Sequence, residues 1–213
     1  NALLLHADII DAIISTGLSE VQISIDAATK ETHERIRKGS SFPKLIANIE
    51  LLQQEKQNRN KKLPRVNFCF TLMRSNMREL PDFLRLAKTL QVERVRATHL
   101  IPFAGLDIMN ESLVHCQEEA NEILRCCRKL AEEIGIDCQV PPDFPADFDN
   151  NRPLVFTKPH CRAPFTTLYI THEGKVVPCD AFPPAELCAG SFLTQSFNEI
   201  WHGPVYTSLR KQF

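Results

Sequence analysis

Three cysteines near the C-terminus have the residue type and surroundings of metal ligands. Cys161, Cys179 and Cys188 lie among Gly, Pro and Asp residues in the stretch CRAPFTTLYITHEGKVVPCDAFPPAELC. The segments TTLYI and KVVP flank His-Glu-Gly, a pattern that predicts a β-hairpin with Gly174 at its tip. Because a hairpin returns the chain to its start, Cys161 and Cys179 can lie close together although 17 residues intervene. Three converging thiolates suit a tetrahedral metal ion or an iron–sulfur cluster.

Spacing alone leaves a second interpretation of these cysteines open. They have neither the CxxC spacing of a zinc knuckle nor the run of a ferredoxin, so they could also be three unrelated reduced thiols. The other five cysteines lie in apolar periodic segments, which predicts that they are small buried hydrophobic residues. These are Cys69, Cys116, Cys126, Cys127 and Cys138. Eight cysteines without a signal peptide predict a cytoplasmic protein, where disulfides are rare.

The composition excludes several classes of partner. The chain has 213 residues, of which 43% are hydrophobic and 24% charged, and its net charge is −1. This balance is typical of a soluble globular protein and gives no electrostatic signature of nucleic-acid binding. No apolar run approaches the roughly 20 residues that span a bilayer. We therefore expect neither nucleic acid nor a membrane as a partner.

Strands alternate with helices over residues 1–140. This alternation predicts parallel βα units with right-handed crossovers and helices outside. Three clear strands are too few to close an eight-stranded barrel, so we expect an α/β fold, an incomplete (β/α) partial TIM-like barrel. Hydrophobic periodicity predicts these three strands at 21–26, 66–73 and 92–101, a further, weaker one at 136–140, and helices at 6–16, 29–37, 42–59, 79–90 and 117–134.

A second, smaller domain follows the expected barrel. Residues 141–160 are dense in Pro, Asp and Asn, which predicts a linker. Beyond it come the hairpin and two short helical pieces, SFNEIWHG and PVYTSLRKQ. The sequence therefore predicts a barrel part at 1–140, a linker at 141–160 and a hairpin-plus-helix auxiliary domain at 161–213.

Four stretches together resemble the radical S-adenosylmethionine (radical SAM) enzymes with a SPASM- or twitch-type auxiliary domain. VQISIDAATKETHERIRKG is similar to the family's fourth strand and the turn after it, VNFCFTLMRSNMRELPDFLRLAKTL to the fifth strand with its helix, and VERVRATHLIPF to the sixth strand. The fourth stretch is the cysteine–hairpin–Gly–cysteine pattern from Cys161 to Cys179, followed by FNEIWHGPVYTSLR. The four cover nearly the whole chain, and their conjunction is more specific than any one of them.

The resemblance implies that polar residues at strand ends line a cavity for cofactor and substrate. Judged by residue type alone, Ser24 and Asp26 could instead cap a turn, Arg37 could be a solvated surface residue and Asn76 could shape a turn. Ala27 departs from the Gly common in the family. Thr98 and His99 are adjacent on a strand, so only one of them can face the cavity. The cofactor-binding residues that the resemblance implies are Ser24, Asp26, Arg37, Asn76 and Thr98.

The resemblance also implies the cofactors. An auxiliary [4Fe-4S] cluster would be held by Cys161, Cys179 and Cys188, with its fourth ligand left open between His160, a residue beyond Phe213 and the substrate. S-adenosylmethionine and a second [4Fe-4S] cluster would bind to a CxxxCxxC loop, whose spacing no cysteines here have. The chain also lacks an initiator Met, so we expect a fragment of a longer enzyme, inactive by itself.

The activity implied for the full-length protein is hydrogen abstraction by a 5′-deoxyadenosyl radical. The substrate would be a peptide or a small molecule, and flavodoxin or ferredoxin would supply the electron. One alternative is a zinc-stapled binding module without redox chemistry. Another is a lyase or aldolase barrel without radicals, which would need a catalytic Lys or paired acids at its strand ends; VQISID and VNFCFTLM supply no lysine there.

Overall fold

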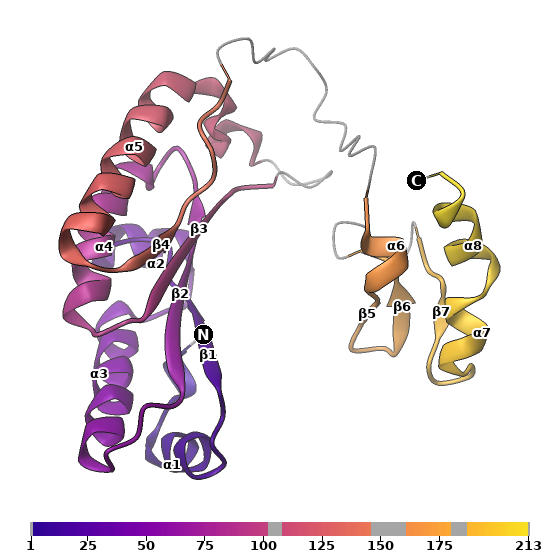
Figure 1. Cartoon of the computed structure of the whole chain (residues 1–213), viewed down its shortest axis with the longest axis horizontal. Coiled ribbons are helices and arrows are strands. Elements are labelled where there is room, and N and C mark those ends of the chain that lie inside the picture. The colour runs from indigo at the N-terminus through magenta and orange to yellow at the C-terminus, as the bar shows by residue number, and fades with distance from the viewer. Residues whose placement is uncertain (1, 102–107, 146–160, 180–186, 213) are drawn as a thin grey trace. The chain divides into compact units, whose positions relative to one another are not determined.

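The computed structural model describes residues 2–101, 108–145, 161–179 and 187–212. The chain divides into two compact units, Asn1–Asn150 and Asn151–Phe213 (Figure 1). Of the predicted linker, residues 146–160 lie outside the described residues, and so does His160. Among the helices that the structure describes, none has the length and apolar character needed to cross a membrane.

The first unit is built on a parallel sheet of four strands in the order β1-β2-β3-β4. Each strand follows one predicted from the sequence, and the α/β fold with parallel strands is confirmed. Strand β1 is shorter than expected, because the chain leaves the strand after Ser24. The strands are β1 (Glu20–Ser24), β2 (Arg65–Leu72), β3 (Arg94–His99) and β4 (Asp137–Gln139).

The helices of this unit begin and end at signals present in the sequence. The side chain of Thr29 caps α2 by accepting a hydrogen bond from the Thr32 N–H. Helix α5 ends at Gly135, whose φ of 67° lies in the left-handed region. The helices are α1 (Ala7–Ser15), α2 (Lys30–Ile36), α3 (Phe42–Asn58), α4 (Leu80–Thr89) and α5 (Gln117–Ile134), with short 3₁₀ turns at Ala2–Leu4, Met77–Glu79, Met109–Glu111 and Leu113–His115.

The hydrophobic core lies between the sheet and helices α3, α4 and α5, which lie together on one side of it (Figure 1). The Phe83 ring on α4 packs against Phe68 and Phe70 of β2, at centroid distances of 5.6 and 4.9 Å. In the strand register Val95 and Ala97 of β3 stand beside these two residues, so they share the same face. All five side chains are buried.

The other face of the sheet carries polar side chains on all four strands, and we call it the polar face. Parallel sheets are usually covered on both faces by apolar contacts, so polar residues here indicate a face that meets water or a ligand. Most of these side chains are exposed or half-buried, and Asn67 is buried. The polar face consists of Glu20, Gln22, Ser24, Arg65, Asn67, Cys69, Thr71, Arg94, Arg96, Thr98, Asp137 and Gln139.

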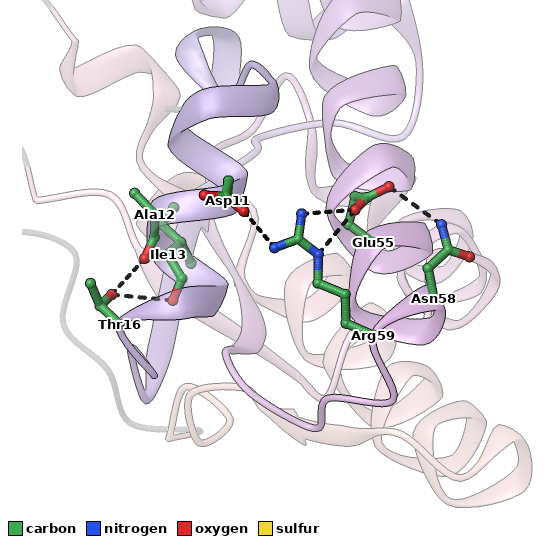
Figure 2. A network of polar contacts seen from close by, with 7 residues as sticks. All are labelled: Asp11, Ala12, Ile13, Thr16, Glu55, Asn58 and Arg59. Carbon is green, nitrogen blue, oxygen red and sulfur yellow. Dashed lines mark hydrogen bonds and ion pairs between the residues drawn. The ribbon is translucent and has the colours of Figure 1, made fainter.

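Arg59, just after the last residue of α3, ties that helix to α1 (Figure 2). One guanidinium nitrogen lies 2.6 Å from an Asp11 carboxylate oxygen, and another lies 3.1 Å from Glu55. The Asn58 side chain donates a hydrogen bond to the same Glu55 carboxylate at 3.3 Å. This network links α1 to the C-terminal end of α3.

The second unit is a small antiparallel sheet with three short helices. The predicted hairpin is confirmed, and Gly174 at its tip has a φ of 75°. The third strand and the first helix are elements that the sequence did not predict. A small core forms around Val176, Ile200 and Tyr206. The elements are α6 (Ala163–Thr166), β5 (Tyr169–Ile170), β6 (Lys175–Val177), β7 (Gly190–Ser191), α7 (Phe197–Trp201) and α8 (Pro204–Arg210).

Candidate cofactor and metal sites

The three C-terminal cysteines flank one end of the small antiparallel sheet. Cys161 precedes α6, which leads into the start of β5. Cys179 follows the end of β6, and Cys188 precedes the start of β7. Because β6 is antiparallel to both neighbours, the start of β5, the end of β6 and the start of β7 all lie at the same end of the sheet. The topology therefore brings the three segments together, as the hairpin pattern predicts.

The three thiols differ in exposure and are not gathered into one ligand set. Cys161 and Cys179 are half-buried, whereas Cys188 is exposed and its sulfur lies 3.4 Å from the Gly190 carbonyl oxygen. Within the described parts of the chain, no group of three or more His, Cys, Asp or Glu side chains could hold a metal ion. Residues 180–186 lie outside those parts. Three thiols are a suitable set of ligands for an iron–sulfur cluster. That these three cysteines bind one cluster together stays a prediction.

Asp26 and Arg37 form a charged pair beyond the end of β1. One Asp26 oxygen accepts a hydrogen bond from Arg37 Nε at 2.7 Å and lies 2.6 Å from a second guanidinium nitrogen. The other oxygen accepts the Thr71 backbone N–H at 2.7 Å. The Asp26 side chain is 4% exposed and that of Arg37 is 34% exposed, so the carboxylate is buried while the guanidinium reaches the surface. Asp26 thus orients Arg37.

Asn76 joins the chain after β1 to the chain after β2. Its side-chain nitrogen donates to the Asp26 and Thr71 carbonyl oxygens, each at 2.9 Å, and its oxygen accepts the Met73 N–H at 2.8 Å. The side chain is buried, and all of these partners are backbone groups. Asn76 therefore shapes the turn after β2, which is the simpler of its two predicted roles.

Glu79 is a member of this network that the sequence did not single out. Its carboxylate accepts the backbone N–H groups of Ala28 and Thr29, at 2.8 and 3.0 Å, ahead of helix α2. Burial alone would raise the pKa of the Glu79 carboxyl, but hydrogen bonds from Thr32, Ala28 and Thr29 lower it below its ordinary value. Its 51-residue separation from Ala28 explains why no local pattern indicated it.

The structure separates the five predicted cofactor residues into two groups. Asp26, Arg37 and Asn76 belong to one hydrogen-bonded network. Ser24 and Thr98 lie on the polar face, where their neighbours in the register are Cys69 and Thr71 respectively. Within the described residues, neither side chain joins that network. The expected alternation at Thr98 is confirmed, because His99 points to the opposite face and packs against Phe144 at a ring distance of 4.8 Å.

Comparisons with known proteins identify relatives of this chain. Residues 161–213 match the model of the SPASM family, described as an iron–sulfur cluster-binding domain. The chain is 26% identical over 236 residues to an AdoMet-dependent heme synthase of Methanosarcina barkeri, covering 99% of this chain and 61% of that protein. It is 24% identical over 214 residues to a PqqA peptide cyclase of Methylorubrum extorquens, covering 94% and 50%. The predicted resemblance to radical SAM enzymes with a SPASM domain is confirmed.

Solved structures of other proteins have the same fold. Streptococcus suis SuiB superposes with a TM-score of 0.73 at 12% identity, covering 99% of this chain and 50% of that one. The structure titled His6 tagged anSMEcpe with bound AdoMet gives a TM-score of 0.69 at 13% identity, covering 98% and 54%. The partial-barrel prediction is thereby confirmed. The chain spans about half to three-fifths of the length of the curated relatives named above.

The cysteines outside the SPASM domain have a different character. Burial raises the pKa of Cys127 to about 12 and that of Cys138 to about 11, so both thiols stay protonated and unreactive. The prediction that all five are buried is confirmed for Cys127 only. Cys69, Cys116 and Cys138 are half-buried, and Cys126 is exposed. Adjacent residues on a helix point about 100° apart, so the face of α5 that buries Cys127 leaves Cys126 in solvent.

The buried His33 and the half-buried His99 make the stability of the barrel part depend on pH. Burial lowers the pKa of His99, and its Nδ1 atom is buried without a hydrogen-bond partner. Burial, followed by the nearby Arg37 charge, also lowers the pKa of His33. A lowered pKa in the folded state means that the unfolded chain binds the proton more tightly. The pKa of a histidine in the unfolded chain is about 6.5. These two residues therefore reduce the free energy of unfolding as the pH falls below that value, and they cost no stability above it.

Replacement of His99 by Phe is expected to weaken this pH dependence. The Phe ring keeps the contact with Phe144 but cannot bind a proton, so its contribution to the decline below pH 6.5 disappears. Urea unfolding of both proteins at several pH values between roughly 7.5 and 5.5 measures the effect. An unchanged dependence on pH in the variant would show that His99 titrates normally in the folded state.

Proposed function

We propose that the chain works within a radical SAM enzyme that modifies a peptide and carries an auxiliary [4Fe-4S] cluster in its SPASM domain. The proposal is supported by the SPASM match over residues 161–213 and by the strand pairing, which brings the chain after β6, with Cys179, and the chain before β7, with Cys188, to one end of the sheet. Thiolate ligands from separate segments are the usual means of holding such a cluster. A zinc-stapled module uses the same ligand type, but it gives no role to the barrel part.

The barrel residues have separate proposed roles. Ser24 and the Arg37 guanidinium would bind polar groups of S-adenosylmethionine, and the buried Asp26 would hold Arg37 in position through its two short contacts. Asn76 would keep the two strand ends in register, and Thr98 would line the same cavity from β3. S-adenosylmethionine, bound beside a reduced [4Fe-4S] cluster of the full-length protein, would take one electron and supply, with loss of methionine, a 5′-deoxyadenosyl radical for hydrogen abstraction from the substrate.

A peptide is the proposed substrate, since two similar proteins have names that specify one. These are the PqqA peptide cyclase of Methylorubrum extorquens and SuiB, whose structure was solved with the precursor peptide SuiA. A one-electron donor such as flavodoxin or ferredoxin would reduce the clusters. We place the enzyme in the cytoplasm, where these donors and reduced thiols occur.

The test is anaerobic purification of the full-length protein. We expect brown protein that contains iron and acid-labile sulfide, and that releases 5′-deoxyadenosine from S-adenosylmethionine after reduction with dithionite. Colourless protein with one zinc ion per chain would instead support the zinc module. Iron-containing protein that releases no 5′-deoxyadenosine under any condition would contradict the radical chemistry while leaving the cluster site standing.

A further inference from the structure

Arg96 occupies the middle of the polar face. The strand register places Ser24, Cys69, Arg96 and Gln139 side by side on β1, β2, β3 and β4. Partners in a parallel register point to the same side of the sheet, so all four side chains lie in one row across it. Arg96 is the charged member of this row.

The charge of Arg96 is left without a counterion. Arg94, two residues earlier on the same face, pairs with Asp137 at 2.6 Å, and Arg65 pairs with Glu20 at 3.7 Å. Within the described parts of the chain, no acidic side chain pairs with Arg96 and no hydrogen bond engages its guanidinium. Its charge still acts locally: burial raises the pKa of Cys69, and Arg96 is the strongest influence that lowers it.

We infer that Arg96 is a specificity residue that binds a carboxylate of the substrate on the polar face. The inference rests on the proposed function, because it assigns this face to the substrate. A guanidinium offers two parallel N–H donors that match a carboxylate. The surrounding side chains of Ser24, Thr98 and Gln139 are uncharged hydrogen-bonding groups, so the row has a net positive charge that favours an acidic ligand.

The position of Arg96 argues for a substrate carboxylate over that of S-adenosylmethionine. The network of Asp26, Arg37 and Asn76 lies beyond the ends of β1 and β2, where the proposed cofactor site is. Arg96 lies on β3, two strand spacings or about 10 Å from β1. If Arg96 binds the side-chain carboxylate of an acidic residue of the substrate, the remaining atoms of that residue would lie between Arg96 and the cofactor. Their hydrogen atoms would then be close enough to the cofactor for abstraction.

The experiment measures glutarate binding to the full-length protein by titration calorimetry. Glutarate carries the carboxylate of an acidic side chain. Removal of a charged hydrogen-bonding pair weakens binding by about 10-fold to 100-fold, and we expect this loss in Arg96→Gln. Arg96→Lys keeps the positive charge but lacks the two parallel N–H donors of the guanidinium, so its loss of affinity should be smaller. Arg94→Gln is the matched control, because it removes an arginine from the same strand and face that is already paired with Asp137, and its affinity should equal that of the unaltered protein.

Two further readouts decide what the carboxylate belongs to. Binding of S-adenosylmethionine should be unchanged in Arg96→Gln, and phenylglyoxal should modify Arg96 more slowly as glutarate increases. Equal glutarate affinity in Arg96→Gln and the unaltered protein would overturn the inference. Loss of S-adenosylmethionine binding in the variant, or protection of Arg96 by that cofactor alone, would overturn it as well. A protein that binds glutarate through Arg96 but releases no 5′-deoxyadenosine would instead contradict the proposed function.

Discussion

Replacement of Cys179 by serine is expected to remove the auxiliary cluster from the SPASM domain. A serine hydroxyl is a poor ligand for iron at neutral pH, and the loss of one of three protein thiolates leaves too few to retain the cluster. The variant should therefore contain about four fewer iron ions and four fewer sulfide ions per chain than the unaltered protein. Colorimetric iron and sulfide assays after anaerobic reconstitution measure this loss. We expect the same result for Cys161→Ser and Cys188→Ser.

The matched control is Cys126→Ser. Cys126 is exposed like Cys188, but it lies on α5 in the barrel part. Its replacement should leave the iron content unchanged, which separates a specific ligand from any accessible thiol. Equal iron in all four variants would contradict the assignment of the three cysteines, and retention of zinc by the unaltered protein would favour the zinc module.

Replacement of Asp26 by alanine is expected to lower the free energy of unfolding by about 2–3 kcal/mol. The change leaves the Thr71 N–H without its acceptor and Arg37 without its counterion. A fully buried pair would lose more, but the Arg37 side chain is 34% exposed and water replaces part of the interaction. Urea unfolding followed by circular dichroism measures the difference.

Two comparisons test the physical cause. Asp26→Asn keeps an acceptor for Thr71 but removes the charge, so its loss should be smaller than that of Asp26→Ala. Asp137→Asn breaks the exposed pair with Arg94 and should have little effect, since both partners are in contact with solvent. If Asp26→Ala proved as stable as Asp137→Asn, the buried network would not be the element that holds the two strand ends.

Local patterns in the sequence predicted most of the barrel part. Helix α5 begins at Gln117 and ends at Ile134 as expected, because its apolar periodicity is sustained and Gly135 stops it. The hairpin was predictable for the same reason, since Gly174 supplies the positive φ that its tip requires. Parallel strands followed from the alternation of strand and helix patterns.

Features that depend on long-range contacts could not be predicted from local patterns. Strand β7 has two residues, too few for a period, and it exists because β6 pairs with it. Glu79 looked like the start of a helix, and only the fold brings it to Ala28. No local pattern indicated Arg96. Its lack of a counterion becomes visible only in the strand register, which shows which side chains lie beside it.

The network around Asn76 has a consequence for how the barrel part could open. Asn76 and Glu79 follow β2, yet both hold backbone groups of the chain after β1. Neither connection can move away from the other without breaking buried hydrogen bonds. A molecule that displaced the chain after β1 would therefore have to displace the chain after β2 as well. We expect a ligand that enters at this edge of the sheet to move both connections in one step.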